Sequence, residues 1–203
     1  MAAIAATIFV LAGCGSSKHA TPTSTAATTT SGPTTQTTTG PGALQGEAAS
    51  AAAGDIPDNQ VYVTLANRLA GYSMKYPEGW AQQGTKSPVT FRDKNNIVRV
   101  VVGPGAAASL ASVRADMRAL QHTVRSLQAQ APKQMTISGA PAIKVVYRTI
   151  SAPNPVTNKR VTLTVDRYYL SHGGRRAVVD LGTPVGVDNV DAYRLMIESF
   201  RWR

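Results

Sequence analysis

A long threonine-rich segment limits how much of this chain can fold. Residues 15–55 contain eleven threonines, no aromatic side chain and a single large aliphatic one, Leu44. Such a composition buries too little apolar surface to offset the entropy lost on ordering the chain. We therefore expect residues 14–55 to form a disordered tether and residues 56–203 to form one globular domain. A domain of nearly 150 residues buries about 70% of its unfolded surface, which is enough for an ordinary core.

The residues before the tether form a short apolar run that ends at the only cysteine of the chain. Residues 1–13, MAAIAATIFVLAG, contain no charged side chain. The run is shorter than the roughly 20 residues that span a bilayer, and it has the length of the apolar part of a signal peptide. The sequence Leu11-Ala12-Gly13-Cys14 resembles the bacterial lipobox. This resemblance implies a signal peptide over residues 1–13, cleavage before Cys14 and a diacylglyceryl group on the Cys14 thiol.

A lipidated Cys14 predicts where the protein works. Acyl chains contribute about 0.8 kcal/mol per buried CH₂, so two or three of them anchor a protein durably. We expect the chain to be lipid-anchored on the extracytoplasmic face of a bacterial membrane. With Cys14 modified, no thiol remains for a disulfide, so the stability of the domain must come from packing.

The domain alternates apolar and polar residues in short runs, which is typical of strands. Tight turns join these runs, so the strands must pair antiparallel, and two amphipathic segments predict helices that cover the sheet. Ser109 is placed to cap the first helix. The class is α+β, with a single antiparallel sheet covered by helices. The expected strands are residues 71–80, 88–93, 96–102, 133–138, 141–150, 159–170 and 175–183, and the expected helices are 110–127 and 187–200.

Two short motifs then suggest a family. The stretch GYSMKYPEGW at residues 71–80 and the ending MIESFRW at residues 196–202 resemble the Mog1/PsbP-like superfamily, over roughly residues 60–203. The resemblance implies an α/β/α sandwich and no catalytic residues, because that superfamily is known for accessory and binding proteins. We interpret Trp80 and Trp202 as core aromatics rather than as a ligand cage.

The domain offers little for catalysis or metal binding. It has two isolated histidines, His122 and His172, and no Gly-x-Ser-x-Gly, His-Glu-x-x-His or phosphate-loop motif. Asp188 and Asp191 fall in the first turn of the last expected helix, where carboxylates complement the helix dipole. We therefore expect no enzymatic activity, no metal and no cofactor.

Positive charge is the remaining signal. Residues 61–203 contain 20 Lys and Arg against 8 Asp and Glu, a net charge of +12. The doublets Lys159-Arg160 and Arg175-Arg176 are candidate contacts with anionic lipid or wall polymer. They begin two strands of one expected hairpin, so they should lie at opposite ends of it and not form one compact site. We expect no nucleic acid partner, because the basic residues are not interleaved with aromatic stacking platforms.

Three function classes follow from these observations. The leading one is a non-catalytic lipoprotein that binds an envelope protein or an anionic envelope component. The second is a carrier of a lipid or small apolar ligand, held in a pocket between helix and sheet. A hydrolase is the third. A basic surface favours the first class, an open apolar cavity the second, and a cleft centred on histidine the third.

Overall fold

The computed structural model describes residues 45–46, 53–154 and 157–203. The predictions of a signal peptide, of a lipidated Cys14 and of most of the tether lie outside the described residues. In the described part of the chain, no helix has the length and apolarity needed to cross a bilayer.

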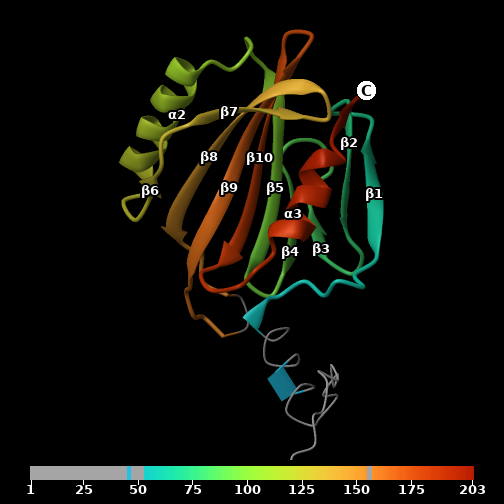
Figure 1. The fold of residues 1–203 in the computed structure, drawn as a ribbon, viewed down its shortest axis with the longest axis vertical. Coiled ribbons are helices and arrows are strands. Elements are labelled where there is room, and N and C mark those ends of the chain that lie inside the picture. Colours follow the sequence, from blue (N-terminus) through green and yellow to red (C-terminus); the bar gives the residue numbers. More distant parts are fainter. Residues whose placement is uncertain (1–44, 47–52, 155–156) are drawn as a thin grey trace, which may run out of the picture. The chain divides into compact units, whose positions relative to one another are not determined.

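The domain has two helices and eleven strands among its described elements (Figure 1). Their bounds are β1 Tyr62–Asn67, β2 Tyr72–Pro77, β3 Ala81–Gln83, β4 Val89–Asp93, β5 Asn96–Pro104, α2 Leu110–Thr123, β6 Gln128–Ala129, β7 Lys133–Ile137, β8 Ala140–Ile150, β9 Thr162–His172, β10 Arg175–Pro184, α3 Val190–Glu198 and β11 Arg201–Trp202.

The strands form two antiparallel sheets instead of one. The large sheet has eight strands in the order β3-β4-β5-β10-β9-β8-β6, and β7 also pairs with β8. The small sheet has the order β1-β2-β11. The expected α+β class is confirmed, but the prediction of a single sheet is wrong in this detail. The strand expected at residues 71–80 pairs with β1 and β11, because β1 precedes it in the chain and the last residues return beside it.

The large sheet is covered on both sides, as an α/β/α sandwich requires. One side carries the core cluster that includes residues of α3 and of the small sheet, such as Met196 and Tyr72. The other side carries a second cluster, in which Val113 and Met117 of α2 pack on residues of β8 and β9. We call these the α3 side and the α2 side, and Figure 1 shows α3 over the large sheet and α2 along its β6–β8 edge.

The two ends of α2 test the predicted cap at Ser109 and the predicted helix end at residue 127. Ser109 caps α2 as predicted, since its side chain accepts a hydrogen bond from the Ser112 N–H and the Ser112 side chain accepts one from the Ser109 N–H. The helix ends at Thr123 and does not reach residue 127. The chain turns there, with the Leu127 N–H donating to the Val124 carbonyl, and Leu127 still enters the core with 6% of its surface exposed. The apolar spacing thus continued beyond the helix itself.

Both tryptophans pack as expected. Trp80 is buried in the core of the α3 side, and the half-buried Trp202 packs edge-on against Phe200 at a ring distance of 5.2 Å. Helix α3 begins at Val190, after the buried Asn189. Asp191 lies in its first turn, and the Asp188 carboxylate accepts a hydrogen bond from the Val190 N–H.

The chain enters the domain beside Asn189. The Asn189 side chain accepts a hydrogen bond from the Ile56 N–H at 2.8 Å and donates to the Gly54 carbonyl at 3.1 Å. Asn96, the first residue of β5, donates to the same carbonyl. Residues 54–56 are therefore held at the end of the large sheet where β5 begins.

Candidate anion-binding site

Helix α2 covers only part of its side of the large sheet. Its apolar residues pack on β8 and β9, where Ile143, Val145 and Tyr169 are buried. Farther across the sheet, Val178 of β10 and Val101 of β5 stay half-buried. The α2 side of β10, β5 and β4 is therefore an open surface beside the helix.

Arginines gather on this open surface. Side chains two residues apart on a strand share a face, and Tyr169, Val178 and Ile97 all belong to the cluster of the α2 side. Arg167, Arg176 and Arg99 lie two positions from these three residues and therefore face the same side. Arg92 pairs with Ile97 across β4 and β5, so it faces this side as well. We call the resulting set the arginine face, and it consists of Arg92, Arg99, Arg167 and Arg176.

Arg167 is bound to a largely buried carboxylate on the same side of the sheet. Its Nε and one terminal nitrogen donate to the two oxygens of Asp180 at 2.6 and 2.8 Å. The guanidinium lies 5.4 Å from the centre of the Tyr147 ring, and the Tyr147 hydroxyl is 3.5 Å from Asp180. Burial acts to lower the pKa of Arg167, but the hydrogen bonds and charge of Asp180 outweigh it and raise that pKa above its usual range. Asp180 is thus committed to Arg167.

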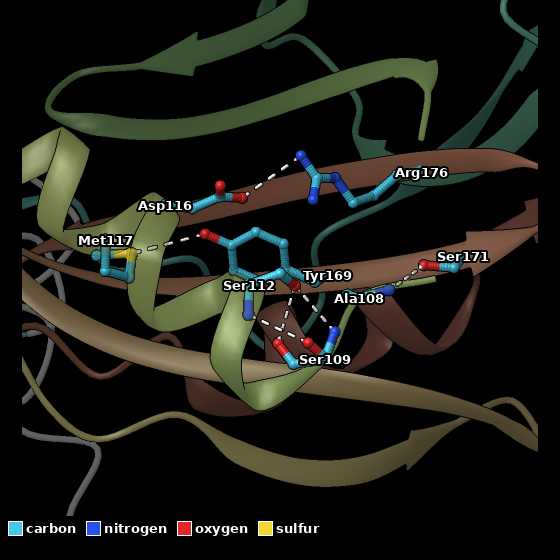
Figure 2. A network of polar contacts seen from close by, with 8 residues as sticks. All are labelled: Ala108, Ser109, Ser112, Asp116, Met117, Tyr169, Ser171 and Arg176. Carbon is cyan, nitrogen blue, oxygen red and sulfur yellow. Dashed lines mark hydrogen bonds and ion pairs between the residues drawn. The ribbon is translucent and has the colours of Figure 1, made fainter. Parts of the chain in front are cut away.

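Arg176 is bound less tightly, to the helix. One of its terminal nitrogens lies 3.4 Å from the Asp116 carboxylate, and both side chains are about a third exposed, at 31% and 38%. Next to this pair, the Tyr169 hydroxyl donates to the Met117 sulfur at 3.6 Å (Figure 2). These contacts join the middle of α2 to β9 and β10 and leave part of the Arg176 charge facing solvent.

Arg99 and Arg92 have no ion-pair partner among the described residues. Arg99 is half-buried opposite Asp180, and Arg92 is exposed opposite Ile97. In this register the two arginines are diagonal neighbours, about 7–8 Å apart. Guanidinium groups bind phosphate and carboxylate with paired hydrogen bonds, so this pair is suited to an anion.

A neutral cleft lies near the start of α2. It has a volume of about 510 Å³ and lies between the residues before the helix and strands β7, β8 and β9. The Ala108 N–H donates to the Ser171 hydroxyl at one wall, which ties the entry of the helix to β9 (Figure 2). The lining contains no charged residue, and it consists of Ala107, Ala108, Gln134, Met135, Thr136, Pro141, Ala142, Ile143, Tyr169 and Ser171.

The two predicted doublets lie away from one another. Arg175 pairs with His172 near the turn between β9 and β10, whereas Lys159 and Arg160 precede β9 at the other end of the sheet. Arg160 donates to the Ser151 carbonyl. Arg175 and Arg176 also separate, because neighbours on a strand face opposite sides. Arg175 lies 4.9 Å from the Trp202 ring and donates to three backbone carbonyls.

Sequence reasoning missed three members of the arginine face. Arg92, Arg99 and Arg167 are single arginines in alternating strands, and each occupies a polar position next to buried residues. Their alternation is visible in the sequence. Their proximity depends on the strand order β4-β5-β10-β9, which no local pattern reveals.

The two histidines do not form a catalytic arrangement with one another. His122 is exposed near the end of α2, and His172 stacks on Trp202 with the ring centres 6.2 Å apart. Within residues 53–154 and 157–203, no group of three or more His, Cys, Asp or Glu side chains is arranged to hold a metal ion.

Comparison with known proteins identifies the fold. No family model matches the chain, and no curated protein does. Cyanobacterial PsbP (CyanoP) from Synechocystis sp. PCC 6803 superposes with a TM-score of 0.54, at 17% identity, over 74% of this chain and 98% of that one. The domain has a PsbP-like fold. At this identity the likeness shows the fold alone, and it confirms the architecture that the two sequence motifs implied.

Two further solved structures are similar at lower scores. The Saccharomyces cerevisiae Ran-binding protein Mog1p gives a TM-score of 0.46 at 9% identity, over 71% of this chain and 96% of that one. LpqN of Mycobacterium tuberculosis, a protein involved in cell envelope biogenesis, gives 0.40 at 12% identity, over 70% of this chain and 84% of that one.

Proposed function

We propose that this protein is a lipoprotein on the extracytoplasmic face of a bacterial membrane, and that its PsbP-like domain is a non-catalytic module that binds an anionic envelope component. The observation that carries the binding role is the arginine face. Four arginines from four neighbouring strands share one open surface with two carboxylates, Asp180 and Asp116, and Asp180 is already bound by Arg167. The surface is left with a surplus of positive charge.

The chemistry of this surface favours phosphate or carboxylate groups. Arg99 and Arg92 make no ion pair within the described residues, so an incoming anion displaces no internal partner. The half-exposed Val101 and Val178 lie between the arginines and offer apolar contact. Because the arginines are partly solvated, their attraction is screened beyond a Debye length of about 8 Å at physiological salt, and binding should weaken steeply as salt is added.

Charge reversal on the arginine face tests this role. Arg92→Glu with Arg99→Glu should abolish binding to phosphatidylglycerol vesicles or to soluble poly(glycerol phosphate), whichever the protein binds. Arg114→Glu with Arg118→Glu, on the exposed surface of α2, changes net charge equally and should leave most binding intact. Vesicle binding alone identifies a lipid headgroup and polymer binding alone a wall component. Equal losses in both variants, or salt-insensitive binding, would contradict a site on this face.

The anchor rests on Leu11-Ala12-Gly13-Cys14 and needs its own test. Cys14→Ala should abolish incorporation of labelled fatty acid and release the protein from the membrane fraction. Cys14→Ser is a second variant with the same expected outcome, since a hydroxyl does not replace the thiol. If the parent protein incorporates no labelled fatty acid and still stays in the membrane fraction, the prediction of a lipobox is wrong.

The neutral cleft favours a second candidate, a carrier of a small apolar ligand. The cleft lies between the residues before α2 and the sheet, and its lining of alanine, proline, isoleucine and tyrosine suits an uncharged molecule. Ala108→Trp should fill it. If the carrier role holds, this variant loses binding of a fluorescent apolar probe, whereas Arg92→Glu with Arg99→Glu does not.

A further inference from the structure

The domain has a second positively charged surface, at the end opposite its chain entry. Residues 54–56 are held at the start of β5, beside Asn96. The last residue of β5, Pro104, pairs with Arg175 at the other end of the sheet. Nine residues at about 3.4 Å each separate these ends by roughly 30 Å. We call the far end the distal surface, and it consists of residues 67–71, 84–88, 172–175 and 199–203.

Hydrogen bonds join these four segments into one surface. Asn67 donates from its side chain to the Lys86 carbonyl at 2.8 Å, and its side-chain oxygen accepts from the Ala70 N–H at 3.0 Å. Arg175 then donates to the carbonyls of Ala70, Gly71 and Arg203 at 3.1 to 3.2 Å. The Arg203 N–H returns to the Gly71 carbonyl at 2.9 Å. The distal surface is therefore a connected structure and not a set of independent loops.

The distal surface contains basic side chains and no acidic side chain. Its segments hold five Lys and Arg and no Asp or Glu, and the nearest acidic residue in the sequence is Glu198, just before the last segment. The ion pairs of the described residues all lie elsewhere in the domain. Arg175 donates to the backbone oxygens of Ala70, Gly71 and Arg203 and forms no ion pair with an acidic side chain among the described residues. The five cations are Arg68, Lys86, Arg175, Arg201 and Arg203.

An apolar side chain projects from the same surface. Leu69 is 72% exposed, the highest value among the exposed large apolar residues described. It lies in the turn between β1 and β2, directly after Arg68, and Gly71 closes that turn at a φ of +65°. A leucine among unpaired cations is complementary to a segment that combines acidic side chains with an apolar one.

We propose that the distal surface docks an acidic segment of a partner protein, with Leu69 contacting an apolar side chain between the carboxylates. This inference rests on the proposed membrane anchor in one respect. A head tethered through residues 54–56 keeps its opposite end accessible to a partner. A protein segment fits better than a lipid surface, because the distal surface lies at the end of the domain farther from the entry of the chain.

Peptide binding by the full chain from Cys14 onward tests the inference. The probe is a short fluorescent peptide of glutamates with one central leucine, and its glutamine counterpart is the peptide control. Arg68→Glu with Arg203→Glu should weaken binding by about tenfold, since two attractions are replaced by two repulsions. Within the described residues neither side chain makes a hydrogen bond or ion pair, so both should be replaceable without unfolding the domain.

Matched variants separate this site from general charge and from the arginine face. Arg114→Glu with Arg125→Glu alters net charge equally on exposed positions elsewhere, and Arg92→Glu with Arg99→Glu alters the arginine face. Both should lose much less binding than Arg68→Glu with Arg203→Glu, because neither pair belongs to the distal surface. Leu69→Ser should weaken binding of the leucine peptide but not of a peptide with serine in its place.

Four results would overturn the inference. The first is that the acidic peptide does not bind, and the second is that the matched variants lose as much binding as Arg68→Glu with Arg203→Glu. The third is that the glutamine peptide binds as well as the glutamate peptide. The fourth is that the protein binds phosphatidylglycerol vesicles and that only the Arg68 and Arg203 changes abolish this binding. The last result would assign the surface to lipid. Failure of the arginine-face experiment leaves these readouts unchanged, so the two proposals fail independently.

Discussion

The Arg167 guanidinium and the Asp180 carboxylate lie largely buried on the α2 side of the large sheet, with 11% and 8% of their side chains exposed. Asp180→Asn would keep the shape of the side chain and remove its charge, which would leave Arg167 buried without a counter-ion. We expect the free energy of unfolding to fall by about 3–5 kcal/mol. Urea unfolding at neutral pH measures this loss.

A surface pair and a double replacement provide the controls for Asp180. Asp191 and Arg194 form an exposed ion pair at 3.3 Å, so Asp191→Asn should cost less than about 0.5 kcal/mol. Arg167→Met with Asp180→Leu removes both charges and should be more stable than Asp180→Asn alone. If Asp180→Asn lowers the free energy of unfolding as little as Asp191→Asn does, Arg167 must find water or another partner in the variant.

Buried tyrosines make the domain sensitive to alkali. Burial raises the pKa of Tyr193 above its ordinary value of about 10, and burial together with the charge of Asp180 does the same for Tyr147. The folded state thus keeps protons that the unfolded state releases, and stability must fall as the pH rises above about 10. Tyr193→Phe should show a shallower alkaline decline, although it loses a hydrogen bond to the Gly182 carbonyl at neutral pH. Unfolding free energies at several pH values test this, and unchanged slopes would contradict it.

Among the elements, α2 depends on its cap. The helix starts at a reciprocal pair of Ser109 and Ser112 bonds, and it has no acidic residue in its first turn. Ser109→Ala should cost about 1 kcal/mol, within the usual range for N-cap serines. Ser109→Asp should retain or exceed the parent stability, because a carboxylate caps the N–H groups and complements the helix dipole. Urea unfolding and amide exchange of α2 report both effects, and a neutral Ser109→Ala would show that packing alone sets the start of the helix.

The elements also show how far local sequence patterns reach. Alternation and turn residues predicted β2, β4, β5, β7, β8, β9 and β10, and burial alternates most regularly along β5, whereas β7 buries only Ile137. Strand β1 was missed although it pairs with β2 over its whole length. Strands β6 and β11 have two residues each, too few to show a period. The end of α2 was placed too late because Val124 and Leu127 keep the apolar spacing of the helix after the chain has turned.

The candidate site was less predictable than the fold. Adjacent basic residues stand out in a sequence, and the doublets were therefore the candidates. Neighbours on a strand face opposite sides of a sheet, so a doublet such as Arg175-Arg176 divides its charge between two surfaces. The arginine face is built from alternate positions on four strands, and its assembly follows from pairing across the sheet. Strand order is a property of the whole core, which is why the site appeared only in the structure.

At the scale of the whole molecule, positive charge is divided between two surfaces with different surroundings. The arginine face contains carboxylates that hold two of its four arginines in place. The distal surface has no Asp or Glu in its segments, and backbone oxygens hold Arg175 there. Residues 54–56 enter the domain at the end of the sheet opposite the distal surface, beside Asn189. The same asparagine thus determines where the folded domain begins.

The boundary of the domain yields the last prediction. The composition of residues 15–55 predicts a tether, whereas Gly54 and Ile56 are bonded to Asn189 inside the domain. Mild proteolysis should therefore cut within residues 15–53 and leave a folded core that starts near residue 54. Asn189→Ala leaves the Ile56 N–H without its side-chain partner, an unsatisfied group that costs about 1–3 kcal/mol, so in this variant cleavage should extend past residue 56. Asp191→Ala, on the exposed surface of α3 next to Asn189, should keep the parent cleavage pattern. Mass spectrometry of the protected fragments decides the outcome, and a protected fragment that retains the threonine run would show that the tether reading is wrong.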